Sequence, residues 1–80
     1  MQKTNDYSHG VKSLVSMAQK INPEIGSYQE HFINESFDFT VKLSNGRLNV
    51  SRVAAQDFEA QPNSISEGQI RRIADSFNAE

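Results

Sequence analysis

Apolar and polar residues alternate from residue 36 to residue 53, on both sides of an Asn-Gly pair. Asn45-Gly46 is the dipeptide that best tolerates the two left-handed positions of a type I′ turn. The pattern therefore predicts a β-hairpin with a two-residue loop at 45–46, and a one-residue slip would reverse the faces of its side chains. The apolar positions are Phe37, Phe39, Val41, Leu43, Leu48, Val50 and Val53, and the predicted pairs are Ser44–Arg47, Leu43–Leu48, Lys42–Asn49, Val41–Val50 and Thr40–Ser51.

Two segments have the apolar spacing of helices. The first is expected at about residues 9–21, capped by Ser8 or Asp6 and ended by Pro23, which disfavours helical geometry in the preceding residue. The second begins at Ser66, where Ser66 and Gln69 have the spacing of a capping box. Its flanking staple would be Ile65 with Ile70, and its buried stripe Ile70, Ile73, Ala74 and Phe77.

Two other segments have weaker patterns. Residues 28–33 predict a strand, with Tyr28, Glu30 and Phe32 on one face and Gln29, His31 and Ile33 on the other. Both faces mix apolar with polar residues, which an edge position or a β-bulge would explain. Residues 54–60 are consistent with a short helical turn around Phe58 or with the tail of a strand.

These elements predict one α+β domain over residues 1–80, with residues 1–7 frayed. The expected order is α-β-β-β-α, a three-stranded antiparallel sheet with both helices packed on one face. The core would contain Leu14, Ala18, Phe39, Val41, Val50, Ile73 and Phe77, and the other face would expose Thr40, Lys42, Asn49 and Ser51.

Composition narrows the class of protein. Eighty residues carry a formal net charge of −2, with charges of both signs mixed along the chain and no cysteine. Disulfides and thiolate zinc sites are therefore excluded, and the charge lacks the basic excess of proteins that bind a phosphate backbone. Residues 1–10 are polar and no apolar run reaches the length of a membrane span, so we expect a cytoplasmic protein without a membrane partner.

The sequence offers no arrangement typical of catalysis. His9 and His31 lie far apart in the chain without metal-ligand spacing, and the carboxylate pairs Glu30/Glu35 and Asp57/Glu59 lie in polar segments. The glycines are isolated, unlike those of a phosphate-binding loop. We therefore expect a protein that is not an enzyme and needs no metal or other cofactor.

Contact with a larger partner is the function that we expect. Phe32 and Ile33 are adjacent in a strand, so one helical layer cannot cover both, and an exposed aromatic on a sheet is a natural anchor for a protein. The candidate partner-binding residues are Tyr28, His31, Phe32, Lys42, Arg47, Asn49 and Arg52. The partner would be a protein or a ribonucleoprotein complex, and the unpaired edge strand could also join two copies in a homodimer.

In its size, lack of cysteine and mildly acidic mixed surface, the chain resembles the small accessory proteins of phages and mobile elements. That group includes inhibitors of bacterial defence systems such as anti-CRISPR proteins. The resemblance implies a non-enzymatic protein that regulates or inhibits its partner by steric contact.

A weak double-stranded nucleic-acid-binding module is the alternative. The predicted element order over residues 11–78 resembles that of double-stranded RNA-binding domains, which implies phosphate contacts from a basic second helix. Here Glu67 has the opposite charge and the arginines come a turn later. The residues for this function would be Arg47, Arg52, Arg71 and Arg72.

Overall fold

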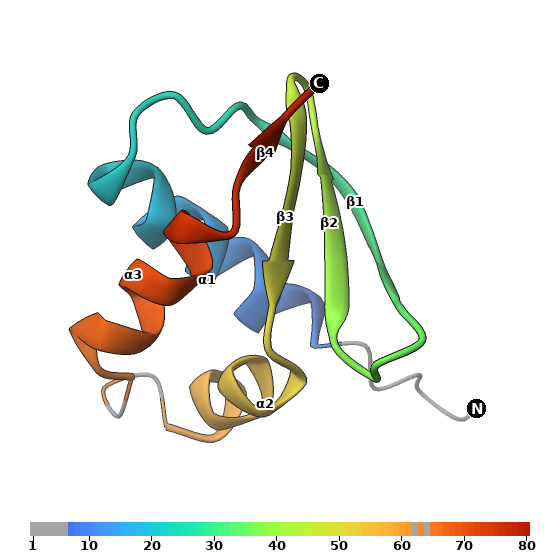
Figure 1. Cartoon of the computed structure of the whole chain (residues 1–80). Coiled ribbons are helices and arrows are strands. Elements are labelled where there is room, and N and C mark those ends of the chain that lie inside the picture. The colour runs from blue at the N-terminus through green and yellow to red at the C-terminus, as the bar shows by residue number, and fades with distance from the viewer. Residues whose placement is uncertain (1–6, 62, 64) are drawn as a thin grey trace.

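The structure, a computed structural model, describes residues 7–61, 63 and 65–80. These residues form an α+β fold with one antiparallel sheet whose strands lie in the order β1-β2-β3-β4 (Figure 1). Along the chain the elements are α1 (Ser8–Ile21), β1 (Tyr28–Ile33), β2 (Phe39–Leu43), β3 (Gly46–Val50), α2 (Arg52–Ala60), α3 (Glu67–Asp75) and β4 (Asn78–Ala79).

The α+β class and the antiparallel sheet are confirmed, but the predicted α-β-β-β-α order is wrong, because α2 and β4 are additional elements. Residues 54–60 are helical since Ser51 caps α2, accepting a hydrogen bond from the Ala54 amide at 3.3 Å. The buried residues of α2 follow helical spacing; they are Ala54, Ala55 and Phe58. Two residues pairing with Gly46 and Arg47 make β4, a strand too short to leave an alternating pattern.

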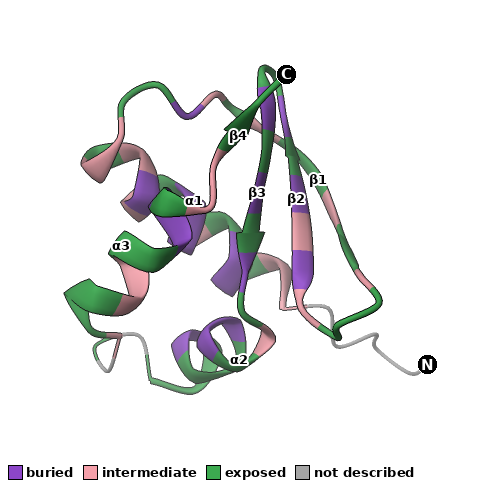
Figure 2. Ribbon diagram, in the orientation of Figure 1, coloured by how far each residue is buried: buried purple, intermediate pink, exposed green. Residues whose placement is uncertain are grey.

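The core lies between the inner face of the sheet and the helices, which Figure 1 shows on one side of the strands. Figure 2 shows the buried stretches of the helices turned toward the strands, and α2 at the lower end of the sheet. Of the predicted core residues only Phe77 is partly exposed. The buried apolar residues are Val11, Leu14, Val15, Ala18, Ile25, Phe39, Val41, Leu43, Leu48, Val50, Ala54, Ala55, Phe58, Ile73 and Ala74.

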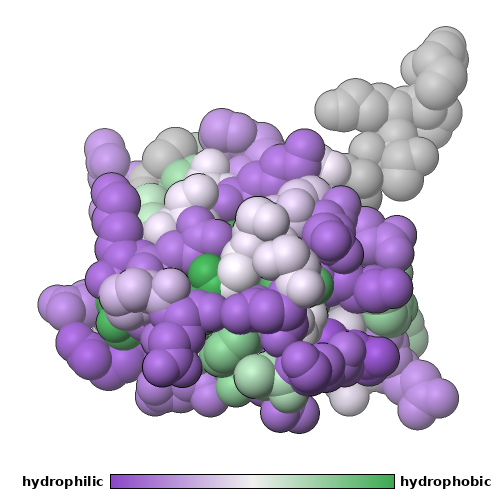
Figure 3. Space-filling view, turned by 90° about the horizontal axis from the view of Figure 1, so that it is seen from above, coloured by the Kyte–Doolittle hydropathy of each residue, from purple (hydrophilic) through white to green (hydrophobic). Residues whose placement is uncertain are grey.

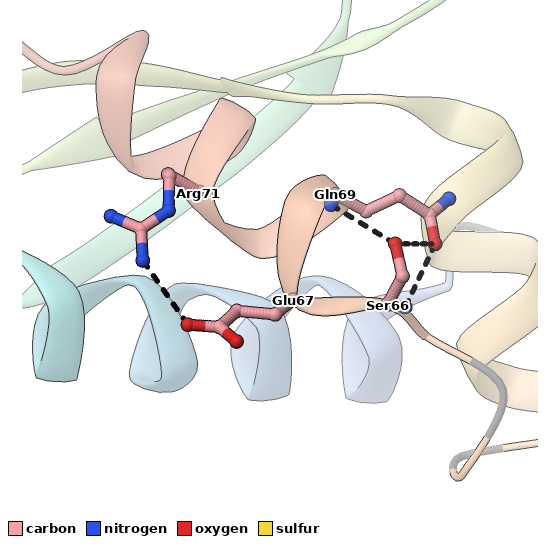
Figure 4. Close-up of polar contacts among 4 residues, drawn as sticks. All are labelled: Ser66, Glu67, Gln69 and Arg71. Atoms are coloured by element: carbon pink, nitrogen blue, oxygen red, sulfur yellow. Dashed lines mark hydrogen bonds and ion pairs between the residues drawn. The ribbon is translucent and has the colours of Figure 1, made fainter.

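The ends of the helices agree only in part with the prediction. The capping box of Ser66 and Gln69 is confirmed (Figure 4), and the staple residues Ile65 and Ile70 both pack against the core. The cap predicted for α1 at Ser8 is wrong, because Tyr7 is the N-cap residue and makes no side-chain cap bond. The alternative cap Asp6 lies outside the described residues, as does most of the segment 1–7 expected to be frayed.

A side chain of α2 accepts a hydrogen bond from the first turn of α1, whose own N-cap residue makes no side-chain cap bond. The Gly10 amide donates a hydrogen bond of 2.7 Å to Oε2 of Glu59, which reaches across from α2. A Cβ at Gly10 would lie 2.7 Å from the carbonyl oxygen of Ala55, so the glycine permits the close approach of the two helices. An acceptor from another helix therefore satisfies one of the amides left open at the start of α1.

The hairpin has the predicted faces but not the predicted register. Val41 lies opposite Leu48 rather than Val50, and the two-residue loop is Ser44-Asn45. Each β2 residue therefore pairs with the β3 residue two positions before the predicted one. Because side chains alternate between faces with a period of two, this shift leaves every side chain on its predicted face. The observed pairs are Phe39–Val50, Thr40–Asn49, Val41–Leu48, Lys42–Arg47 and Leu43–Gly46.

Asn45 and Gly46 have tertiary roles that explain the shift. The Asn45 side chain accepts from the Gly26 amide at 2.9 Å and donates to the Glu24 carbonyl at 2.8 Å, which fixes the loop to the segment before β1. A Cβ at Gly46 would collide with the main chain of Asn78 and Ala79. The dipeptide therefore serves the neighbouring segments, and Asn45 does not have the positive φ of a type I′ turn.

Strand β1 is both an edge strand and bulged, as its mixed pattern suggested. The register shifts between Tyr28 and Glu30, so that Tyr28 lies opposite Leu43 while Glu30 lies opposite Lys42. Paired residues share a face, so the bulge puts Tyr28 on the inner face with His31 and Ile33, and Glu30 and Phe32 on the outer face.

Candidate partner-binding surface

Four of the seven predicted partner-binding residues share the outer face of the sheet. Phe32 lies opposite Thr40 on β2, and Thr40 lies opposite Asn49 on β3; Lys42 lies opposite Arg47 in the same way. We call this surface the open face and define it by Glu30, Phe32, Thr40, Lys42, Arg47 and Asn49. The described helices all pack on the opposite side of the sheet, which leaves this side uncovered by them (Figure 1).

Acidic residues pair with both cations of the open face. Lys42 Nζ lies 3.6 Å from Glu30 Oε2, and Arg47 Nε lies 2.8 Å from Glu80 Oε2. All four side chains are largely exposed, so these ion pairs add little stability. Their consequence is a face with balanced charge rather than a basic one.

The structure separates Tyr28 and His31 from the open face. Both belong to the inner face, where the Tyr28 hydroxyl is hydrogen-bonded to His31 Nδ1 at 2.6 Å. The His31 ring meets the buried ring of Phe39 edge-on, with centroids 5.1 Å apart, and Lys12 Nζ lies 5.4 Å from the Tyr28 ring centroid. These two side chains therefore cover the core beside β1. The sequence pattern does not give the position of the bulge, which is what puts Tyr28 on the inner face.

The seventh residue, Arg52, belongs to a different part of the molecule. It begins α2 at the end of the sheet away from the hairpin loop, and its Nε donates to the Phe37 carbonyl at 3.0 Å. Its own amide donates to Asp38 Oδ1 at 3.3 Å. Arg52 thus joins the start of α2 to the connection between β1 and β2.

That connection is a compact turn built around Asn34. The Asn34 side chain accepts from the amides of Ser36 and Asp38 and donates to Thr40 Oγ1 at 3.1 Å. Phe37 sits in this turn with φ 63°, a left-handed conformation that is unfavourable for a bulky residue. Its ring is 69% exposed, so its predicted place on the core face of the hairpin is wrong.

Exposed large hydrophobic residues of the described chain gather at the end of the sheet that carries the β1–β2 turn. They are Phe32 at 47%, Ile33 at 53%, Phe37 at 69% and Val53 at 56% exposed. Phe32 and Ile33 end β1, Phe37 lies in the turn that follows, and Val53 lies in the first turn of α2. The hydrogen bond from Arg52 to the Phe37 carbonyl joins this turn to α2. We call Ile33, Phe37, Arg52 and Val53 the apolar tip. Sequence reasoning missed it, because Phe37 follows the strand alternation and the pattern of residues 54–60 is consistent with either a helical turn or a strand.

The opposite end of the molecule is different in character. Figure 3 looks down on the end that carries the hairpin loop and the C-terminus, and hydrophilic side chains cover most of it. Apolar side chains appear there only as small separate spots. Among the described residues, the large hydrophobic side chains that are exposed are therefore concentrated at one end rather than scattered.

A shallow cleft of about 230 Å³ borders the tip, between the sheet, α2 and α3. Several polar side chains that line the cleft make hydrogen bonds within the fold. Ser51 caps α2, Gln69 completes the capping box, and Ser76 is hydrogen-bonded to the main chain of Asn49. The lining consists of Asp38, Asn49, Ser51, Ala54, Gln69, Arg72, Ile73 and Ser76.

The other residues considered for chemistry lie apart. The ring of His9 packs against Phe58, with centroids 5.9 Å apart, whereas His31 lies beside β1. Within the described ranges, no group of three or more His, Asp or Glu residues is placed to hold a metal ion.

The four arginines of the nucleic-acid alternative do not form one surface. Arg47 pairs with Glu80, Arg71 pairs with Glu67 at 3.1 Å (Figure 4), Arg52 bonds the turn and Arg72 lines the cleft. The observed element order also differs from that of double-stranded RNA-binding domains, because α2 stands between β3 and α3.

Comparison of the chain with models of known protein families, with curated proteins and with solved structures finds no match. Among the described helices, none has the length and apolar character needed to cross a bilayer.

Proposed function

We propose that this chain is a small non-enzymatic binding protein that regulates or inhibits a larger macromolecular partner by steric contact. The partner is a protein or a protein-containing complex, and the apolar tip docks into an apolar pocket on its surface. Inhibition of this kind, as in anti-CRISPR-like inhibitors of bacterial defence systems, blocks a working surface of the partner without any reaction.

The observation that carries the proposal is the outward placement of Phe37. A bulky residue in the left-handed region costs free energy, and an exposed ring recovers none of it in the unbound protein. The turn is nevertheless rigidly hydrogen-bonded through Asn34 and Arg52. An aromatic residue whose main chain is held by hydrogen bonds, beside an arginine, has the composition of a binding hot spot and a preorganised backbone.

Charge supports a protein rather than a nucleic acid as the partner. The cations of the open face are paired with carboxylates, and the tip carries one arginine among apolar side chains. Phosphate binding needs several unpaired cations on one surface. An apolar tip with a balanced polar face beside it resembles the core and rim of a protein interface.

Quantitative affinity capture from a lysate of the source cells tests the proposal. The tip variant F37S/V53S is compared with the wild type and with a control, K20S/D75S, which changes two exposed residues outside both the tip and the open face. Hot-spot residues contribute about 2 kcal/mol or more, so the tip variant should retain at least tenfold less of the partner. The control should retain the wild-type amount, and circular dichroism should show that all three chains are folded.

Nuclease treatment of the lysate separates the two partner classes. Retention that survives nuclease and is lost in the tip variant supports the proposal. Retention that is equal in the tip variant and the control, or that disappears with nuclease, would refute it.

A further inference from the structure

The hairpin loop Ser44-Asn45 is attached to the segment that leads into β1. Ser44 Oγ accepts a hydrogen bond from the Ser27 amide at 3.1 Å, and the Ser44 amide donates to the Ser27 carbonyl at 2.9 Å. The Asn45 side chain uses both of its polar atoms, Oδ1 toward the Gly26 amide and Nδ2 toward the Glu24 carbonyl. Figure 1 shows the loop and this segment together at the upper end of the sheet. We call this arrangement, Ser44 and Asn45 bonded to residues 24–27, the docked loop.

Asn45 is also the asparagine of this chain that is followed by glycine. Asparagine is one of the thermally labile residues of proteins, and a following glycine has no side chain to hinder attack on the asparagine amide. In that reaction the main-chain nitrogen of Gly46 bonds to Cγ of Asn45, the Cγ–Nδ2 bond breaks, and Nδ2 leaves as ammonia with the proton that the Gly46 nitrogen gives up. Water then opens the cyclic imide at either carbonyl and gives aspartate or isoaspartate.

The docked loop opposes this reaction. Ring closure needs the side-chain amide of Asn45 to turn toward its own main chain, which breaks its hydrogen bonds to residues 24–26. The main chain is held as well, because Gly46 pairs with Leu43 on one side and Ala79 on the other, and the Asn45 carbonyl accepts from the Glu80 amide at 2.9 Å. The reaction therefore requires a local opening of the loop, and its rate follows the fraction of open molecules.

The products of the reaction do not fit the docked loop. A carboxylate only accepts hydrogen bonds, so it has no hydrogen for the Glu24 carbonyl that Nδ2 of Asn45 contacts at 2.8 Å. A charged oxygen would face a carbonyl oxygen there, and the isoaspartate product would also lengthen the main chain where β3 begins. Because ammonia is lost, the change is not reversed when the loop closes again.

We propose that Asn45 is a deamidation site controlled by the docked loop, and that its conversion to a carboxylate irreversibly releases the loop from residues 24–27. The modification goes beyond the proposed function. It adds a negative charge at the end of the sheet that carries the hairpin loop, which Figure 3 shows to be mostly hydrophilic. The apolar tip lies at the other end, so the modification changes the attachment of β1 and leaves Phe37 exposed.

Gly26 offers a way to open the docked loop without changing the reacting pair. A Cβ at Gly26 would collide with Oδ1 of Asn45 and with Oγ of Ser44, so G26A displaces both side chains of the loop. G68A is the matched control, because a Cβ at Gly68 would make only an ordinary van der Waals contact. Asn45 and Gly46 are the same in both variants.

Mass spectrometry of tryptic digests measures the reaction after incubation in mildly alkaline buffer, as an exchange of NH for O in the peptide that contains Asn45. Two hydrogen bonds of ordinary strength correspond to a difference of about tenfold or more in the open fraction. Folded G26A should therefore deamidate about tenfold faster than the folded wild type or more, and G68A at the wild-type rate. In urea all three chains should react at one common rate, at least as fast as folded G26A.

Amide exchange tests the release of the loop by the product. N45D has the side chain of the aspartate product, so the Ser44 amide, which donates to the Ser27 carbonyl, should exchange about tenfold faster than in the wild type. N49D makes the same change of charge at an exposed asparagine of β3 outside the loop. In N49D the Ser44 amide should exchange at the wild-type rate.

Each part of the mechanism has an outcome that would overturn it. Equal deamidation rates in the folded and the urea-unfolded wild type would overturn control by the fold. A folded G26A that reacts as slowly as the wild type would overturn control by the docked loop, and unchanged Ser44 exchange in N45D would overturn the release. Circular dichroism shows whether G26A is folded, and if it is not, the wild type in buffer and urea and the pair N45D and N49D still decide the outcome.

Discussion

Arg52 Nε donates a hydrogen bond to the main-chain oxygen of Phe37 at 3.0 Å, although the two residues are 15 positions apart in the chain. The bond fixes the turn between β1 and β2 to the first residue of α2. It holds the main chain of Phe37 while the ring points into solvent. The main chain of the turn is thus hydrogen-bonded where its side chain is exposed, so variants can test the stability of the fold separately from the exposed ring.

Phe37 and Phe39 should differ sharply when each is replaced by alanine. F39A removes a ring that is 1% exposed in the core and should lower the free energy of unfolding by about 3–5 kcal/mol. F37A removes an exposed ring and should change it by less than about 0.5 kcal/mol, as at an ordinary surface position. Urea unfolding of both variants measures the difference. Equal losses would mean that Phe37 packs in the core, as the alternating pattern predicts.

Glycine at position 37 should be better tolerated than alanine. The left-handed φ of 63° is accessible to glycine but costs other residues about 1 kcal/mol or more. F37G should therefore be more stable than F37A by about 1 kcal/mol, although glycine loses more chain entropy on folding. Urea unfolding measures the difference in stability between F37G and F37A. If F37G is less stable than F37A, the turn does not hold residue 37 in this conformation.

Gly46 and Gly68 form a second pair with opposite expectations. A Cβ at Gly46 would collide with the main chain of β4, so G46A should lower the free energy of unfolding by about 1–3 kcal/mol. A Cβ at Gly68 would make only an ordinary van der Waals contact, 3.8 Å from Ser66 Oγ, so G68A should raise the free energy of unfolding by up to about 1 kcal/mol.

Amide exchange reports where G46A acts. The Glu80 amide donates to the Asn45 carbonyl at 2.9 Å, and its exchange should accelerate when β4 is displaced. If G46A is neutral and Glu80 exchanges as in the wild type, β4 does not pair with β3 as described.

Glu59 should stabilise the start of α1 from a distance. E59A removes the acceptor of the Gly10 amide, a partly buried group, and should cost about 1–2 kcal/mol in the free energy of unfolding. E59Q keeps an oxygen acceptor and should lose less. Q56A, an exposed change on the same helix, is the control. Thermal unfolding measures the series, and equal effects of E59A and Q56A would contradict the contact.

The sequence predicted the elements whose pattern is set by local chemistry. The range of β1, the start of α3 at its capping box and the inner face of the hairpin are examples, because capping and alternation depend on neighbours in the chain. Even the wrong register preserved the faces, since it differed by two residues.

The remaining features depend on contacts between distant segments. The local pattern predicts Asn45 as a turn residue but not its hydrogen bonds to the main chain of Gly26 and Glu24. Nor does it show that Gly46 lies against the main chain of β4, where a Cβ would collide. The bulge in β1 reversed the expected face of Tyr28, so this candidate site residue lies on the inner face, away from Phe32. The apolar tip depends on the placement of Arg52 beside Phe37, which no local pattern records.

Site-specific photo-crosslinking in the source cells tests the central claim most directly. A benzoylphenylalanine placed at Phe37 should give one discrete adduct with a larger protein. The same group at Lys20, an exposed residue in the last turn of α1, should not give that adduct. Illumination that yields no adduct from position 37, or the same adduct from both positions, would contradict the proposal that the apolar tip binds the partner.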